Sequence, residues 1–230
     1  MADKILPYAP GPHSYLDWGE EVVVLAPRMT ESPTAVVFDD TLYCLYRGTD
    51  GCLWYTTFDG LDWGGATKVD PEVGVTESPA AVVYQDKLFC LHQGAANDGW
   101  LWCTSFDGAK WESDKATHYG MSKSPGAVVY RNNILVVRQG RGEVGTTWWG
   151  YRDPGGYWLE DQQMADVGTT AGPALVVHPG SPEKVYCLHR GSGGSHDIWL
   201  TSFDGTSWTK DVKVMSDDAV SGSPAVLRLT

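Results

Sequence analysis

The sequence predicts an all-β protein, a five-bladed β-propeller whose single domain covers residues 1–230. Two observations support this fold class. The composition is rich in turn-forming and aromatic residues, with 27 Gly, 13 Pro and 11 Trp in 230 residues, while only 20% of the residues are charged. A pattern of about 46 residues also recurs along the chain, and each copy contains several short apolar segments. Short strands repeated at such an interval, with turn residues between them, are typical of propeller blades.

A dipeptide marks the beginning of each repeat. It occurs as Ser32-Pro33, Ser78-Pro79 and Ser124-Pro125, then as the variant Gly172-Pro173, and again as Ser223-Pro224. The spacings are 46, 46, 48 and 51 residues. We therefore expect four-stranded blades to begin near residues 32, 78, 124 and 172, and a closing blade to combine residues 223–230 with residues 1–31.

The first two strands of each repeat are nearly continuous apolar runs. In the first repeat they are residues 32–38 ("SPTAVVF") and residues 41–47 ("TLYCLYR"). The corresponding pairs in the later repeats are 78–84 and 87–93, 124–130 and 133–139, and 172–178 and 184–190. A strand with one face in water alternates apolar and polar residues, whereas these runs indicate burial on both faces, as between stacked blades.

The third strand ends in a recurring turn. Residues 53–58 ("LWYTTF") lead into Asp59-Gly60, and the same pattern follows residues 101–106 and 198–203. The glycine of this turn can adopt positive φ, and the aspartate can accept backbone N–H bonds. The fourth strand is expected to begin at the tryptophan that follows, which packs between neighbouring blades: Trp63, Trp111, Trp158 and Trp208. The segment "TWWGYRDPGGYW", residues 147–158, departs from this pattern.

The two ends of the chain are expected to close the ring. The segment "SPAVLRLT", residues 223–230, is a fifth copy of the first strand. The N-terminal "DKILPYAP" resembles "DKLFCLHQ", which follows the first strand of the second repeat. Joining the ends therefore continues the repeat in register.

Charge and composition exclude several classes of partner. The net charge is −12 and the isoelectric point is about 4.8, so a nucleic-acid backbone would be repelled. No apolar run approaches the roughly 20 residues that cross a bilayer. The segment "MADKILPYAPGPHS" lacks the features of a signal peptide, so we expect a cytoplasmic protein or release without a classical signal; a mature secreted form is the alternative. The sequence does not set the oligomeric state.

The cysteines and histidines suggest no metal site or cofactor, because no CxxC or HxxxH spacing occurs. Cys44, Cys90 and Cys187 share one repeat position and are expected to be small buried residues. Cys90 and Cys103 lie on neighbouring segments, where a disulfide is an open alternative.

Polar and aromatic residues gather around the loops between the second and third strands. These loops ("GTDGC", "GAANDGW", "GRGEVGTT", "GSGGSHD") are glycine-rich and variable, and variable loops commonly carry recognition. Arg, His, Gln and Glu side chains can hydrogen-bond the vicinal hydroxyl groups of a sugar, and an indole face can pack on the C–H face of its ring. The sequence therefore predicts a shallow saccharide site in each blade near this rim.

The candidate sugar-binding residues are Glu31, Arg47, Trp54, Glu77, His92, Gln93, Trp102, Arg138, Gln139, Trp148, His189, Arg190 and Trp199. A second interpretation stays open for many of them. A tryptophan at a repeated position also fills a core, and a polar pair also serves hydrogen bonds between blades. Trp100 and Trp149 have no counterparts in the other repeats, which makes them candidates for exposed aromatic plates.

These repeats, their turn tryptophans and their polar–aromatic sets resemble those of β-propeller lectins. The architecture is similar to the five-bladed tachylectin-2 type, and the chain also resembles the fucose-binding propeller lectins of fungi and Photorhabdus-type bacteria. The turn motif resembles the structural Asp-box of sialidase propellers. The fucose-binding families use an Arg, a Glu and a Trp between adjacent blades, and the resemblance implies these roles for Arg47, Glu31 and Trp54.

The sequence as a whole predicts a multivalent carbohydrate-binding protein whose partners are glycans or glycoproteins. The alternatives are a protein-interaction propeller and the receptor-binding component of a toxin or defence protein. A glycoside hydrolase is disfavoured, because that reaction needs two carboxylates roughly 5–10 Å apart. The acids here recur in turns or are scattered in loops, so we expect no enzymatic activity.

Overall fold

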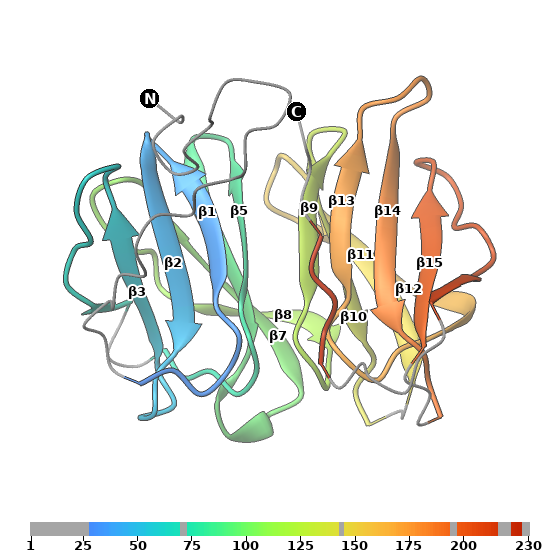
Figure 1. Cartoon of the computed structure of the whole chain (residues 1–230), viewed down its shortest axis with the longest axis horizontal. Coiled ribbons are helices and arrows are strands. Elements are labelled where there is room, and N and C mark those ends of the chain that lie inside the picture. Colours follow the sequence, from blue (N-terminus) through green and yellow to red (C-terminus); the bar gives the residue numbers. More distant parts are fainter. Residues whose placement is uncertain (1–27, 70–72, 143–144, 194–196, 216–221, 227–230) are drawn as a thin grey trace, which may run out of the picture.

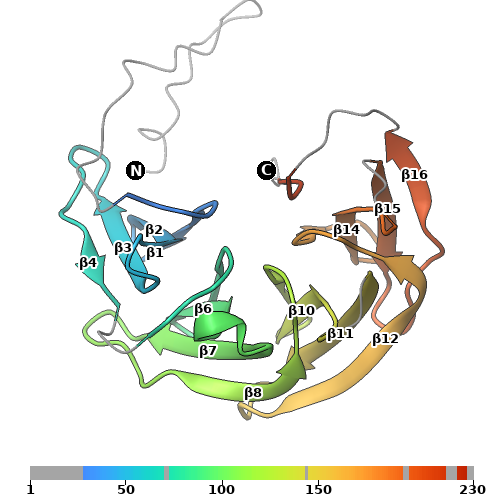
Figure 2. The same cartoon turned by 90° about the horizontal axis from the view of Figure 1, so that it is seen from below.

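The computed structural model describes residues 28–69, 73–142, 145–193, 197–215 and 222–226. These residues form four antiparallel sheets of four strands each, arranged around an axis (Figures 1 and 2). Within each sheet the strands are neighbours in sequence order. The prediction of an all-β propeller with four-stranded blades is confirmed. In the described part of the chain, no helix is long and apolar enough to cross a membrane.

The four blades are numbered I to IV along the chain. Blade I contains β1 (Thr34–Phe38), β2 (Thr41–Arg47), β3 (Leu53–Phe58) and β4 (Thr67–Lys68). Blade II contains β5 (Ala80–Tyr84), β6 (Lys87–Gln93), the 3₁₀ turn η2 (Ala95–Asn97), β7 (Trp100–Phe106) and β8 (Lys115–Gly120). Blade III contains β9 (Gly126–Tyr130), β10 (Asn133–Gln139), β11 (Thr146–Arg152) and β12 (Trp158–Gly168). Blade IV contains β13 (Ala174–His178), β14 (Lys184–Arg190), β15 (Ile198–Phe203) and β16 (Val212–Met215).

The strand boundaries differ from the predicted ones at two places in the blade. The first strands begin after the Ser-Pro dipeptide, because proline has no N–H to donate to the ladder. In blades I, II and IV the fourth strand begins four residues after the turn tryptophan, so the predicted start is wrong there. In blade II, Trp111 makes an isolated bridge to Phe106, and the Thr104 hydroxyl donates to the Glu112 carbonyl at 2.6 Å. Blade III has Gly150 at that threonine position, and β12 runs continuously from Trp158.

The turns between the third and fourth strands have the predicted geometry. Gly60, Gly108 and Gly205 have φ of 98°, 94° and 98°. In blade II, Asp107 Oδ1 accepts the backbone N–H groups of Ala109 and Lys110 at 2.9 and 2.8 Å. These donors hold the pKa of the Asp107 carboxyl below its ordinary value.

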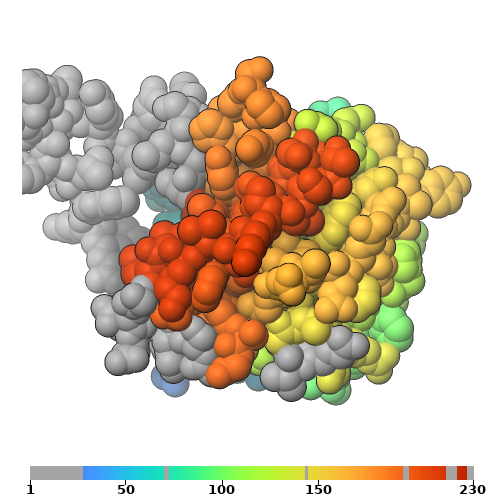
Figure 3. All heavy atoms as spheres, turned by 90° about the vertical axis from the view of Figure 1, so that its right-hand side faces the viewer, coloured from blue at the N-terminus to red at the C-terminus, as the bar shows by residue number. Residues whose placement is uncertain are grey.

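The hydrophobic core lies between successive blades. Blades I and II share a cluster that includes Leu45, Leu53 and Phe106, and two similar clusters join blades II to III and III to IV. The second strands of blades II and III are buried on both faces, as in β10, where Ile134–Gln139 are all buried. In β14 of blade IV buried and half-buried residues alternate, and β2 of blade I is mostly half-buried. The fourth strands form the outside of the ring, and all four residues of β16 are exposed on the face shown in Figure 3.

The innermost strands surround an axial cavity of about 230 Å³. Its lining includes the first residues of all five repeats, with Ser223-Pro224 beside the four dipeptides of blades I to IV. Blades III and IV approach closely here, since a Cβ atom on Gly126 would lie 2.4 Å from the carbonyl oxygen of Pro173.

The expected count of five blades is not reached by the described residues, which form four. The closing blade was predicted from residues 223–230 and 1–31, and residues 1–27 and 227–230 lie outside the described part. The ring closure therefore stays a prediction. The five cysteines all belong to the described residues and are free thiols, so Cys90 and Cys103 are not bridged.

Candidate functional site

The loops between second and third strands form one rim of the ring, here called the loop rim, together with the connections between blades. In blade I, for example, the Leu53 N–H donates to the Val73 carbonyl at 3.1 Å. The opposite rim, here called the turn rim, carries the turns between first and second strands and between third and fourth strands. The sequence predicted the saccharide sites on the loop rim.

The repeated tryptophans of the loop rim fasten the loops. The Trp54 indole N–H donates to Asp50 at 3.0 Å, and the Trp102 indole N–H donates to Asp98 at 2.7 Å. Trp148 donates to the Thr146 hydroxyl at 3.3 Å. In blades I and IV an ammonium group covers the indole, with Lys68 5.1 Å from the Trp54 ring centre and Lys213 5.3 Å from that of Trp199. These contacts hold the tryptophans as parts of the scaffold.

The next-to-last residue of three second strands is buried and paired with a carboxylate that lies in the fourth strand or directly before it. His92 lies 3.2 Å from Asp114, and His189 lies 3.0 Å from Asp211. Arg138 is only 1% exposed and pairs with Asp161 in the same way. A buried polar group needs a partner, and here each one is supplied within its own blade.

The last residue of the second strand joins one blade to the next. Arg47 Nε donates to the Val75 carbonyl at 2.7 Å, and a second nitrogen of the same guanidinium donates to the Thr30 hydroxyl. Gln93 donates to the Met121 carbonyl at 3.4 Å, and Gln139 donates to the Thr169 carbonyl at 2.9 Å. Arg190 is half-buried at the same position of blade IV.

The two predicted glutamates precede the innermost strands. Glu77 lies 3.3 Å from Lys123 of the next repeat, an ion pair that joins blades II and III. Glu31 is half-buried just before β1. Of the predicted set Glu31, Arg47 and Trp54, the last two are therefore held by partners in the protein. The sugar-binding role of this set stays a prediction.

The loop rim still carries two features that face solvent. Trp100 is 37% exposed, and the guanidinium of Arg141 lies 4.6 Å from its ring centre. Trp199 and Asp211 line a hollow of about 300 Å³ together with Asp166 and Lys210. Trp149 was expected to be an exposed plate, but this is wrong: it is only 8% exposed and packs in the core between blades III and IV.

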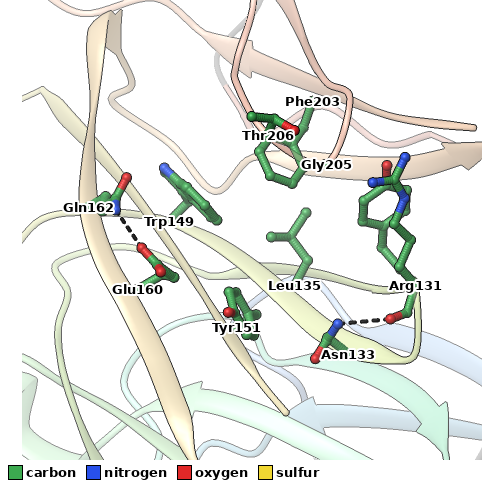
Figure 4. A pocket seen from close by; sticks show the side chains of 11 residues that line it. Arg131, Asn133, Leu135, Trp149, Tyr151, Glu160, Gln162, Phe203, Gly205 and Thr206 are labelled. Atoms are coloured by element: carbon green, nitrogen blue, oxygen red, sulfur yellow. Dashed lines mark hydrogen bonds between the residues drawn. The ribbon is translucent and has the colours of Figure 1, made fainter. Parts of the chain in front are cut away.

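The largest described cleft lies on the turn rim between blades III and IV, and it is here called the III/IV cleft (Figure 4). Its volume is about 440 Å³. Leu135, Trp149 and Tyr151 form its apolar floor, and Phe203 and Thr206 of blade IV form the facing wall. Its polar lining residues are Arg131, Asn133, Glu160 and Gln162.

Glu160 and Gln162 occupy one side of this cleft. Gln162 donates from its amide to the Glu160 carboxylate. Glu160 has a φ of 65°, in the left-handed region that costs a non-glycine residue about 1 kcal/mol or more. It lies where the pairing of β11 and β12 shifts register between Trp149 and Tyr151.

A tyrosine of blade II supports this irregularity. The Tyr119 hydroxyl donates to the Leu159 carbonyl, next to Glu160. Gly150 leaves room for it, since a Cβ atom there would lie 2.3 Å from the Tyr119 oxygen. The neighbouring blade therefore helps to fix the backbone that carries Glu160.

Arg131 occupies the opposite side of the cleft (Figure 4). It belongs to the two-residue turn between β9 and β10, where Arg131 and Asn132 have φ of 45° and 58°. Its guanidinium lies 5.0 Å from the Tyr130 ring centre and close to Gly205, where any side chain would collide with it. The Asn133 amide donates to the Arg131 carbonyl at 2.8 Å.

The III/IV cleft combines an apolar floor with hydrogen-bonding groups of both kinds on two sides. This suits a ligand with an apolar ring face and several hydroxyl groups. Glu160 is the only carboxylate among its described lining residues. No group of three or more His, Cys, Asp or Glu residues that could hold a metal ion occurs in the ranges that the structure describes.

Of these lining residues, the sequence singled out Trp149 alone, as an exposed aromatic plate. The signal was the departure of residues 147–158 from the repeat, which supplies Trp149 and Tyr151 of the cleft and the glycine that admits Tyr119. That segment was recognised as different but was not interpreted as a site.

No family model and no curated protein matches this chain. Solved propeller structures resemble it. A fucose-specific lectin from Aleuria aurantia matches with a TM-score of 0.58 and 14% identity over 76% of this chain and 57% of the lectin. An exo-β-1,3-galactanase from Phanerochaete chrysosporium matches with a TM-score of 0.61 and 9% identity over 81% of this chain and 50% of the enzyme.

A family 117 glycoside hydrolase from Zobellia galactanivorans has a TM-score of 0.55 and 14% identity over 81% of this chain and 73% of that one. The chain thus spans 57% and 50% of the lectin and the galactanase. At these identities the likeness concerns the fold alone, which is the propeller that the four blades form.

Proposed function

We propose that this protein is a lectin, a carbohydrate-binding protein without enzymatic activity, and that its sites are clefts between successive blades on the turn rim. The observation that carries the proposal is the III/IV cleft. Tyr151 and the small exposed part of Trp149 offer aromatic surface beside the carboxylate of Glu160 and the guanidinium of Arg131. A neutral saccharide presents the complementary features, an apolar ring face and hydroxyl groups around its edge.

The backbone at Glu160 supports a binding role. A left-handed glutamate is unfavourable by itself, and it persists because Tyr119 and the shifted β11–β12 register fix it. Strain of this kind commonly accompanies functional side chains. Here it holds the carboxylate on one side of the cleft.

The structural neighbours are consistent with this proposal. Two lectin structures in the comparison carry fucose ligands, an α-methyl-L-fucoside and Fucα1-6GlcNAc. Arg131, Glu160 and Trp149 are also the three residue types that the fucose-binding families use between blades, although they are not the residues that the sequence predicted. Fucose and galactose therefore belong in the first panel of ligands.

The hydrolases among the neighbours raise the alternative of a glycosidase. Glycoside hydrolysis needs a pair of carboxylates across the scissile bond. The III/IV cleft has one among its described lining residues, and the described lining of the axial cavity consists of Ser, Pro, Thr, Ala, Gly, Leu and Val. The loop-rim hollow does contain two carboxylates, Asp166 and Asp211, but Asp211 is paired with His189 at 3.0 Å. Binding without turnover fits these linings better.

Multivalency in this proposal comes from the presence of more than one cleft on the turn rim. A second cleft of about 360 Å³ occupies the equivalent place between blades II and III. Each neutral hydrogen bond contributes about 0.5–1.5 kcal/mol. A single site would thus have a Kd of about 0.1–1 mM, and several sites on one rigid rim would gain avidity.

Calorimetry with fucose, galactose and N-acetylglucosamine tests the proposal on the full chain. Glu160→Gln should weaken the best neutral ligand about tenfold, since a charged acceptor contributes more than a neutral one. Glu31→Gln is the matched control on the loop rim and should leave the affinity unchanged.

Other outcomes would point to other functions. If folded protein binds no glycan on a broad array, the lectin proposal fails and a function as a protein-interaction module is favoured. Turnover of a chromogenic glycoside would establish a hydrolase. Equal losses for Glu31→Gln and Glu160→Gln would remove the assignment to the III/IV cleft.

A further inference from the structure

The cleft between blades II and III, here called the II/III cleft, has the place of the III/IV cleft but a different chemistry. Lys87, Cys103, Ser105 and Lys115 of blade II face Arg152 of blade III across it. Glu112, Ser113 and Trp158 complete much of the lining, and its volume is about 360 Å³.

The strand registers align the two clefts residue by residue. Cys103 pairs with Lys115 as Trp149 pairs with Gln162, so Cys103 and Lys115 replace Trp149 and Gln162. Ser105 takes the place of Tyr151. Two bulky aromatic side chains are thus replaced by small ones, and a neutral amide is replaced by an ammonium group.

Further substitutions add positive charge. Lys87 stands where the III/IV cleft has Asn133, since each begins the second strand of its blade. Arg152 ends β11 where Phe203 ends β15. At three equivalent positions the II/III cleft thus has a cation where the III/IV cleft has a neutral residue, whereas Arg131 is the one cation of the described III/IV lining.

Arg152 has an unused hydrogen-bonding group. Its guanidinium lies 4.9 Å from the Phe89 ring centre, and its Nη1 is buried with no hydrogen-bond partner in the described residues. No ion pair to Arg152 occurs within 4.0 Å among those residues either. A buried donor without a partner is costly, and an incoming acceptor would remove that cost.

The acidic groups nearby leave the cleft positive. Glu112 is the only carboxylate of its described lining and lies 3.8 Å from Lys87. Asp153, next to Arg152 in sequence, accepts the Tyr157 N–H at 2.8 Å. Burial raises the pKa of Cys103 to about 12, so its thiol is neutral. Asp114 also lies near Cys103 and adds to the rise of its pKa, but this carboxylate is paired with His92 at 3.2 Å. The described lining itself has three cations and one carboxylate, in a chain of net charge −12.

We propose that the II/III cleft binds the anionic group, a carboxylate or a sulfate ester, of an acidic saccharide. Arg152 and Lys115 contact this group, and Lys87 adds long-range attraction. The inference extends the proposed lectin function: one rim then recognises a neutral sugar in the III/IV cleft and an acidic sugar in the II/III cleft. A glycan that carries both residues would engage two clefts of the same molecule.

Calorimetry with the full chain at low and high salt provides the test. The probes are galactose, glucuronic acid and galactose 6-sulfate, so that the carboxylate and the sulfate are compared separately. The acidic probes should bind more tightly than galactose to the II/III cleft, and their affinity should fall with salt. Arg152→Gln should weaken them about tenfold or more, because a charge-assisted contact is lost.

Two further variants separate a site from general attraction. Lys110→Gln removes the same charge from the exposed turn of blade II outside this cleft and should leave the affinity unchanged. Lys115→Gln, at an exposed position, should weaken the binding of the acidic probes. This variant provides the test if Arg152→Gln does not fold. Equal effects of Lys110→Gln and the cleft variants would overturn the proposal.

The two proposals fail separately. If galactose binds in a Glu160-dependent manner and neither acidic probe binds more tightly, the anion site is wrong and the lectin function stands. If the acidic probes bind through Arg152 while no neutral sugar depends on Glu160, the assignment of the III/IV cleft is wrong and the anion site stands.

Discussion

Trp148 and Trp149 are consecutive residues of β11, but their side chains lie on opposite faces of the blade. Trp148 is the copy of a tryptophan found in every described blade, and its indole N–H is held by Thr146. Trp149 occurs in blade III alone, and it contacts Phe203 of the next blade at 4.9 Å between ring centres while lining the III/IV cleft. The repeated residue serves the scaffold, whereas the unrepeated one lies at the proposed site.

The same contrast holds for the two rims. On the loop rim the polar groups repeat from blade to blade, and most of them are engaged by carboxylates, carbonyls and hydroxyls of the protein. The indole N–H of Trp199 is an exception, since it has no hydrogen-bond partner among the described residues. On the turn rim the clefts differ from one another in charge and size. A residue that recurs at each blade meets the same structural need each time, so a specific ligand site is better sought where the blades differ.

Gly94→Ala should have the largest effect on stability, because it disrupts a contact in the scaffold of the loop rim. A Cβ atom there would lie 2.3 Å from Asp98 Oδ2 and 2.4 Å from the indole nitrogen of Trp102. Relieving this overlap breaks the bond between them, and we expect a loss of about 3 kcal/mol, the upper end of the usual range for overpacking. Urea denaturation measures it, and saccharide binding at the turn rim should persist.

Gly65→Ala is the control, since no heavy atom lies within 4 Å of its added Cβ. If Gly94→Ala is as stable as this control, the tryptophan is not a fastening of the loop, and the contrast between the two rims loses its basis.

Most of the fold could be predicted from the sequence because the fold repeats. The second strands were predicted within a residue, and the turn glycines have the expected positive φ. The error in the fourth strands came from a hydroxyl bond, such as that from Thr104 to Glu112, which delays the strand after the tryptophan. The threonine recurs at this position in blades I, II and IV, but a strand residue of this kind does not by itself reveal which carbonyl its hydroxyl binds.

The site could be predicted less well. Arg131, Glu160 and Thr206 belong to three distant segments and meet only because two blades stack. The left-handed backbone of Glu160 depends on Tyr119 of a fourth segment, which belongs to blade II. The scaffold role of His92 and His189 did leave a signal, since each histidine has an aspartate 22 residues later, Asp114 and Asp211.

Replacing one arginine on each rim, Arg47→Ala and Arg131→Ala, compares the two rims directly. The expected effects are smaller than that of Gly94→Ala. Arg47 binds the Val75 carbonyl at 2.7 Å and joins two blades, so its loss should cost about 1.5 kcal/mol, the lower end for a half-buried charged donor. Arg131 is exposed and lines the III/IV cleft, so its removal should weaken saccharide binding with little loss of stability. Parallel denaturation and calorimetry measure both. A loss of binding in Arg47→Ala at unchanged stability would return the site to the loop rim.

Asp107→Asn should have the smallest effect, and it should depend on pH. The Lys110 and Ala109 N–H groups lower the pKa of Asp107 in the folded state. A carboxyl with a depressed folded pKa contributes stability above its unfolded pKa of about 3.9, and this contribution disappears as pH falls through the folded value. The wild type should therefore melt at a higher Tm than Asp107→Asn at pH 7. The difference in Tm should shrink below pH 4, as the Asp107 carboxyl becomes protonated in both the unfolded and the folded protein. Thermal melts from pH 2 to pH 7 measure this, with Asp62→Asn, which shows no such pair of backbone donors, as the control. Because the turn belongs to the scaffold, saccharide affinity at pH 7 should be the same in both proteins; a selective loss of binding in Asp107→Asn would place the recurring turn in the site after all.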